Sequence, residues 1–121
     1  MNILIKEIIY MLKNLFTLLS ILAVFVSLQS FAGEQTGKIS KIIVRASDNL
    51  HYFILEGGSV NKPACALATY WMIKDESSAA GKTQISMLLS AHAQQKTIRV
   101  VGTDTCTRWS DGEDVNVIFL D

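Results

Sequence analysis

Residues 75–95, DESSAAGKTQISMLLSAHAQQ, decide the fold, because after the N-terminal quarter this is the segment with helical spacing. Four of its residues fall on one helical face at spacings of three and four: Ile85, Leu88, Leu89 and His92. N-cap residue types stand at its start, namely Asp75, Ser77 and Ser78, and Glu76 suits the positive end of a helix dipole. The sequence therefore predicts a helix over 75–95, with His92 as a partly covered helix residue.

The same segment contains AAGKT, which resembles the end of a phosphate-binding loop. Such a loop needs a first glycine five positions before Gly81, so that bare amides can wrap the phosphates. Glu76 occupies that position, and its carboxylate would repel a phosphate. The sequence thus argues against nucleotide binding.

Strand-like segments flank the helix on both sides. Five are predicted from β-branched and aromatic runs between turn residues: 37–46, 50–56, 64–73, 97–103 and 115–120. The order is β-β-β-α-β-β, so the chain is predicted to be mainly β with one helix, folded as a five-stranded OB-fold barrel. An α+β sandwich with the helix on an open antiparallel sheet is the alternative.

The N-terminal quarter of the 121-residue chain is typical of a leader. Lys6 and Lys13 supply positive charge, and an apolar run follows over residues 15–28. Small residues, Ser30 and Ala32, stand three and one positions before the expected cut at Gly33. We predict a signal peptide over 1–32, starting at Met1 or Met11, and an OB-fold-like domain over 33–121. A retained anchor is the alternative, but the run is shorter than the roughly 20 residues that span a bilayer.

Removal of this leader leaves a nearly neutral domain. Of eleven basic and eleven acidic residues, the leader takes Lys6, Lys13 and Glu7, which leaves nine and ten. No basic field attracts nucleic acid. The predicted location is secreted or periplasmic, with no stable membrane anchor.

Cys65 and Cys106 are the two cysteines of the chain. An exported chain meets an oxidising compartment, where such a pair becomes a disulfide. Two free buried thiols are the alternative, and a zinc site lacks companion ligands at suitable spacing.

Several short motifs resemble the B subunits of AB5 toxins, nearest to the subtilase-cytotoxin and pertussis-like branch. In order they are FILEGG, PACA, the aromatic pair Tyr70-Trp71, a helix containing LL, TIRVVG and the later Cys106. The resemblance covers most of residues 38–102. It implies an OB-fold, a homopentameric ring, binding of cell-surface glycans or glycoproteins, and a separate catalytic A subunit.

The resemblance also implies that the helix over residues 77–95 lines the ring, with subunit contacts at Lys82, Met87 and Ala91. Met87 and Ala91 lie beside the apolar stripe, so packing within the domain is the alternative for both. Family members have an N-terminal segment with Tyr and Ser residues that helps bind sialic acid. This chain offers only Glu34-Gln35-Thr36 there, so no glycan-contact residue is carried over.

The polar stretch 106–114 holds the candidate ligand-binding residues: Arg108, Trp109 and Asp111. A sugar is held by an aromatic face and by hydrogen bonds to its hydroxyls, which these residue types supply. The alternative is a loop with Trp109 folded onto the barrel. The acidic residues Asp111, Glu113 and Asp114 lack calcium-loop spacing and indicate a solvated turn.

No catalytic constellation, cofactor motif or metal set is found in the sequence. The predicted function is therefore an exported non-catalytic binding module that resembles a glycan-binding toxin B subunit. The alternative is a periplasmic protein-binding or inhibitor domain on an OB scaffold.

Overall fold

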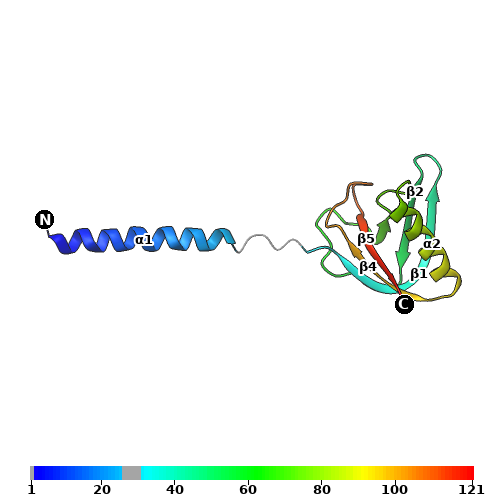
Figure 1. The fold of residues 1–121 in the computed structure, drawn as a ribbon, viewed down its shortest axis with the longest axis horizontal. Helices are drawn as coiled ribbons and strands as arrows, with labels where there is room; N and C mark the ends of the chain where they lie inside the picture. Colours follow the sequence, from blue (N-terminus) through cyan, green and yellow to red (C-terminus); the bar gives the residue numbers. More distant parts are fainter. Residues whose placement is uncertain (1, 26–30) are drawn as a thin grey trace. The chain divides into compact units, whose positions relative to one another are not determined.

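The structure, a computed structural model, describes residues 2–25 and 31–121 and divides the chain into two compact units, Met1–Ser30 and Phe31–Asp121 (Figure 1). The first unit contains helix α1 (Ile3–Phe25). The prediction of a single helix is therefore wrong for the whole chain, because the apolar predicted leader is itself helical. Ser30 and the end of the apolar run lie outside the described residues. Among the helices that are described, none has the length and apolar character needed to span a bilayer.

The second unit is a closed five-stranded barrel (Figure 1). Its strands are β1 (Glu34–Arg45), β2 (Leu50–Leu55), β3 (Tyr70–Met72), β4 (Thr97–Gly102) and β5 (Glu113–Leu120). They follow each other round the barrel as β1-β2-β3-β5-β4, and β4 pairs again with β1. The β3–β5 pair is parallel and the others are antiparallel. This arrangement is consistent with an OB-like barrel, and the open-sheet alternative is wrong.

Strand β1 closes the barrel because it pairs with two partners. Its first half, Glu34 to Lys38, pairs with β4, and its second half, Ile39 to Arg45, pairs with β2. The register shifts between Ile39 and Lys41, where a bulge bends the strand. A bent strand shared by two partners leaves no open sheet edge.

Helix α2 (Ala79–Ala93) lies between β3 and β4 in the chain and packs against β1 and β5. Its Leu88 and Ala91 belong to the hydrophobic core, which also includes Phe53, Trp71 and Ile98. The Nδ1 atom of the partly buried His92 lies 3.1 Å from the Ile39 carbonyl oxygen. This contact agrees with the expected role of His92 as a partly covered residue.

Three local predictions are wrong. Strand β3 has only three residues, since the alanine-rich residues 64–69 form a short turn and irregular backbone in place of a strand. Helix α2 begins after the N-cap Ser78, because Asp75 Oδ1 accepts from the amide of Ser77 in a turn. Leu89, expected on the buried face, is 56% exposed, because the helix presents its small residues Gly81 and Ala91 to the domain together with Leu88.

Gly81, the glycine of the AAGKT motif, has a packing role. Its amide donates to the N-cap Ser78 Oγ at 3.0 Å. A Cβ built on Gly81 would overlap the carbonyl oxygen of Asp75. The glycine is therefore required by the close approach of the capping turn to the helix.

Gly81→Ala is expected to destabilise the domain by about 1–3 kcal/mol, the cost of forcing a methyl group into occupied space. In an open helix position the same change would stabilise by about 1 kcal/mol, so the sign of the effect tests the packing. The measurement is urea unfolding followed by fluorescence. Ser86→Ala on the exposed side of α2 is the control, expected within about 0.5 kcal/mol of the original chain. A Gly81→Ala chain more stable than the original would contradict this packing.

Candidate binding face

Three aromatic side chains from distant parts of the chain gather on the outer surface of the barrel. Tyr52 on β2 and Tyr70 on β3 are in edge-to-face contact, with ring centroids 5.3 Å apart. Trp109, from the loop between β4 and β5, stacks on Tyr70 at 5.8 Å and meets Tyr52 edge-on at 6.1 Å. We call these three residues, with Arg45 and Asp111, the aromatic platform.

Strand geometry explains why the two tyrosines face outward. Phe53 and Trp71 pair across β2 and β3 and are fully buried. Successive strand residues point to opposite faces, so their neighbours Tyr52 and Tyr70 emerge on the outside. The platform thus depends on the same register that fills the core.

Arg45 of the platform pairs with Asp48 at the hairpin between β1 and β2. The guanidinium carbon of Arg45 lies 4.1 Å from the Trp109 ring centroid. Its Nε and Nη2 donate to the two carboxylate oxygens of Asp48, at 2.8 and 2.5 Å. This hydrogen bonding is the main cause that lowers the pKa of the exposed Asp48 carboxyl to about 2. The platform therefore has a charged edge that stays ionised over the whole physiological range.

Asp111 holds Tyr70 in place from the other side. The Tyr70 hydroxyl donates to Asp111 Oδ1, and the backbone amide of Ala68 donates to the Asp111 carbonyl at 2.9 Å. Burial first, and then the hydrogen bond to Asp111, raise the pKa of Tyr70 to about 12. Trp109 is 36% exposed, so this face remains open to a ligand.

Arg108, predicted as a ligand-binding residue, does not join the aromatic platform and instead pairs with Glu76. Its Nη2 lies 2.9 Å from Glu76 Oε2 and donates to the Asp48 carbonyl at 3.1 Å. The buried Glu76 also accepts from the His51 amide at 2.8 Å. Arg108 thus ties its loop to the turn between β1 and β2 and, through Glu76, to the turn before α2. Arg45 supplies the cation of the platform. Sequence reasoning missed Arg45 because 63 intervening residues separate it from Trp109, and no local pattern brings them together.

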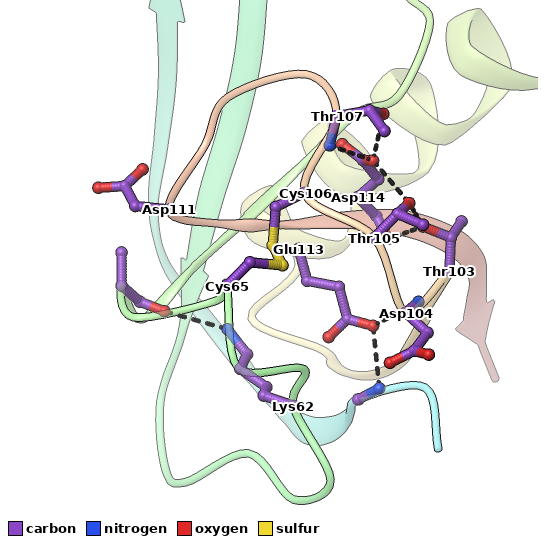
Figure 2. The surroundings of a disulfide bond; sticks show 12 residues. Lys62, Cys65, Thr103, Asp104, Thr105, Cys106, Thr107, Asp111, Glu113 and Asp114 are labelled. Carbon is purple, nitrogen blue, oxygen red and sulfur yellow. Dashed lines mark hydrogen bonds between the residues drawn. A yellow bond between two sulfur atoms is a disulfide. The ribbon is translucent and has the colours of Figure 1, made fainter. Parts of the chain in front are cut away.

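Glu113, expected in a solvated turn, is instead fully buried, and so is Asp114. The Asp114 carboxylate accepts from the amides of Thr107 and Arg108 at 2.9 and 3.1 Å, and from the Thr105 and Thr107 hydroxyls. Burial acts to raise the pKa of Asp114, but these hydrogen bonds, led by Thr107, outweigh it and the pKa is lowered. Figure 2 shows Asp114 among the threonines of this loop. A buried ionised carboxylate therefore shapes the loop that carries Trp109.

The predicted disulfide between Cys65 and Cys106 is confirmed, with Cα atoms 6.2 Å apart (Figure 2). It joins the turn before β3 to the loop before β5. The free-thiol alternative is therefore wrong. The bond restrains the two segments that lead to Tyr70 and Trp109.

The residues predicted for subunit contact lie in three different environments. Lys82 is exposed, Met87 is partly buried and packs against the core, and Ala91 is completely buried within its own domain. Ala91 therefore follows the alternative of packing inside the domain. The residues that the structure describes include no group of three or more His, Cys, Asp or Glu side chains placed to hold a metal ion.

A concave region of about 360 Å³, separate from the platform, lies between the start of α2 and β5. Its lining includes Asp75, Gly81, Gln84 and Asn116. Gln84 spans it by donating to the Asn116 carbonyl at 3.0 Å. It contains no aromatic side chain, in contrast to the platform.

Comparisons with protein-family models, with curated proteins and with solved structures find no match to this chain. The toxin resemblance stays an expectation from short motifs. The candidate site is accordingly argued from the chemistry of the platform.

The contact between Tyr70 and Asp111 predicts an unusual alkaline titration. The raised pKa means that the contact stabilises the fold fully below pH about 10, the ordinary value of a tyrosine, and is lost as the pH rises through about 12. Asp111→Asn removes the charge, so the Tyr70 pKa is expected to fall toward 10. Ultraviolet titration of the tyrosines in the Phe31–Asp121 unit measures this. Asp104→Asn in the same loop is the control, and equal effects of both changes would contradict the assignment.

Removal of the disulfide is expected to lower the free energy of unfolding by about 3–4 kcal/mol, from the entropy of a loop of 41 residues. The change is Cys65→Ala with Cys106→Ala, and the measurement is denaturant unfolding. The Trp109 side chain is expected to become more exposed to solvent before global unfolding, because the loop loses its restraint. Its fluorescence reports this change. Unchanged stability and an unchanged Trp109 environment would contradict a restraining role.

Proposed function

We propose that the domain is an exported, non-catalytic OB-fold module that binds glycans on the aromatic platform. The observation that carries this proposal is the convergence of Tyr52, Tyr70 and Trp109 beside charged groups on one open face. OB-folds bind oligosaccharides and oligonucleotides on the face of strands 2 and 3 and on the loop between strands 4 and 5. The platform occupies that same place.

The chemistry of the platform favours a sugar over a nucleic acid. Indole and phenol rings offer apolar faces to the C–H groups of a sugar ring, and charged side chains hydrogen-bond its hydroxyls. Arg45 covers Trp109, and within residues 2–25 and 31–121 its guanidinium pairs only with Asp48, an exposed partner. A sugar can displace the guanidinium from the ring and accept a hydrogen bond from it. The near-neutral charge of residues 33–121 does not support a phosphate backbone.

Export is part of the same proposal. It is supported by the leader pattern with small residues at Ser30 and Ala32, and by a disulfide, which persists in oxidising compartments. The toxin resemblance adds a homopentamer with α2 facing the ring axis, and an A subunit. The exposed Lys82 and Leu89 on α2 are available for such contacts.

Trp109→Ala is expected to weaken binding to the glycans selected on a glycan array by roughly 30-fold. This corresponds to the loss of about 2 kcal/mol seen when a central aromatic contact is truncated. The measurement is titration calorimetry with the best glycan of the array and the Phe31–Asp121 unit. The barrel, its core and its disulfide all lie in this unit.

Phe119→Ala is the matched control. Phe119 is 38% exposed and lies under Arg99 at 3.8 Å, as Trp109 lies under Arg45, but it belongs to β5. Its removal is expected to leave glycan affinity unchanged. No glycan bound, together with a monomer by light scattering, would overturn the toxin-like proposal and favour the protein-binding or inhibitor alternative, for which a pull-down that depends on Trp109 is the test.

A further inference from the structure

Glu113, the first residue of β5, is a buried carboxylate with an incomplete set of partners. It is 0% exposed. Its Oε1 accepts from the amides of Gly33 and Asp104, each at 2.9 Å. Within residues 2–25 and 31–121, no hydrogen-bond donor reaches its Oε2. A buried carboxylate oxygen without a partner is costly, so the site has capacity for a further donor.

The carboxylate lies in a space that glycines leave free. A Cβ on Gly33 would overlap Oε2, and a Cβ on Gly102 would overlap Oε1. Gly102 also donates its amide to the Gly33 carbonyl at 2.8 Å, which holds the start of β1 against β4. The unpartnered oxygen therefore faces Gly33.

The nearest cation, Lys62, does not complete the site. Its Nζ donates to the Ala68 carbonyl at 3.2 Å and lies 4.4 Å from the Trp71 ring centroid. Burial is the main cause that lowers the pKa of Lys62, and the charge of Glu113 opposes this effect. Figure 2 shows the Lys62 amine pointing away from Glu113, while the Glu113 carboxylate points toward Asp104. None of the ion pairs in the described residues includes Glu113.

Gly33 is also the first residue after the expected leader. The signal-peptidase pattern at Ser30 and Ala32 lies in the sequence before Gly33 and does not involve Glu113. Hydrolysis adds water across the Ala32–Gly33 amide: the hydroxyl goes to the Ala32 carboxyl and a hydrogen to the Gly33 nitrogen. The new amine takes up a proton at neutral pH, since its ordinary pKa is about 8. The nitrogen that donates one hydrogen bond to Glu113 in the uncut chain would then carry three donors and a charge.

We propose that Glu113 is the receptor for the mature N-terminus, and that removal of the leader creates a buried ion pair between the Gly33 α-ammonium and this carboxylate. The inference rests on the proposed export and goes beyond glycan binding. Gly33 is buried in the folded domain, so the cut precedes folding and the fold then protects the new end. The uncut chain folds with the Oε2 of Glu113 unpartnered and is less stable.

The ion pair links processing to the binding loop. Asp104, whose amide shares Oε1 with Gly33, begins the loop that carries Trp109. Asp114, next to Glu113, holds the rest of that loop. Removal of the leader at Gly33 thus stabilises the β4–β5 loop, although Gly33 lies at the start of the domain and the loop lies near its end.

The test compares two versions of the barrel domain that both end at Asp121. One begins at Gly33 with a free amino group, and the other begins one residue earlier, at Ala32. Each is made with Glu113 and with Glu113→Gln. With Glu113, the Gly33 chain is expected to have an unfolding equilibrium constant roughly ten- to hundredfold smaller, because hydrogen bonds to charged groups are strong when buried. With Glu113→Gln, the two chains are expected to be equally stable. Equal stability with Glu113, or a difference that persists with glutamine, overturns the proposal.

A second measurement does not depend on the folding of the glutamine variant. The pKa of the Gly33 α-amino group, followed by NMR titration, is expected to lie above its ordinary value of about 8. If this pKa is raised, the extra stability of the Gly33 chain is fully present below pH about 8, the ordinary pKa of the amino group. It is lost as the pH rises through the raised pKa of the folded domain. Lys62 and Asp104 lie near the carboxylate, and Asp114 follows it in β5, so these titratable residues are followed in the same titration. An ordinary pKa overturns the proposal.

Mass spectrometry of the exported protein must also find Gly33 at the N-terminus, and any other first residue overturns the inference. Glycan binding is measured on the same Gly33 chain. Loss of glycan binding with the Gly33–Glu113 coupling intact rejects only the proposed ligand. Glycan binding without the coupling rejects only the inference.

Discussion

Two consecutive carboxylates, both completely buried, constrain this domain more than any other feature. Glu113 and Asp114 begin β5 where it pairs with β3 in the parallel ladder of the closed barrel. Side chains of successive strand residues point to opposite sides. Glu113 therefore receives amides from Gly33 and Asp104, and Asp114 receives those of Thr107 and Arg108. Buried charges require such donors, so the chain entry and the β4–β5 loop fold around them.

The aromatic platform is a consequence of that constraint. The loop held by Asp114 and by the disulfide places Trp109 over the outward-facing tyrosines of β2 and β3. These tyrosines face outward because Phe53 and Trp71 fill the core. The structure thus combines a rigid set of strands with a loop that is tied down at several points. Such preorganisation favours binding, since little ordering is left to be done when a ligand arrives.

Local patterns in the sequence predicted the element order well and the side-chain partners poorly. The helix, four of the five strands and the disulfide were expected close to where they lie. Strand β3 was overestimated because its alanine-rich approach looks strand-like but forms a short turn and irregular backbone. Arg108 was expected at the ligand, yet Glu76 binds it inside the domain. Asp114 was expected in solvent because a run of acidic residues normally indicates a surface turn, yet the loop amides and hydroxyls bind it inside the domain.

By itself the sequence indicated the order of strands and helix and a disulfide between its two cysteines, and Glu76 in place of the first glycine argued against a phosphate-binding loop. These properties depend on periodicity and on residue type within short segments, and both can be read locally. The tertiary structure decided which residues form the platform and which carboxylates are buried. Arg45, Tyr52, Tyr70 and Trp109 come together only when the barrel closes. The use of Gly33 as a partner of Glu113 likewise depends on β1 meeting β4, a contact between the two ends of the domain.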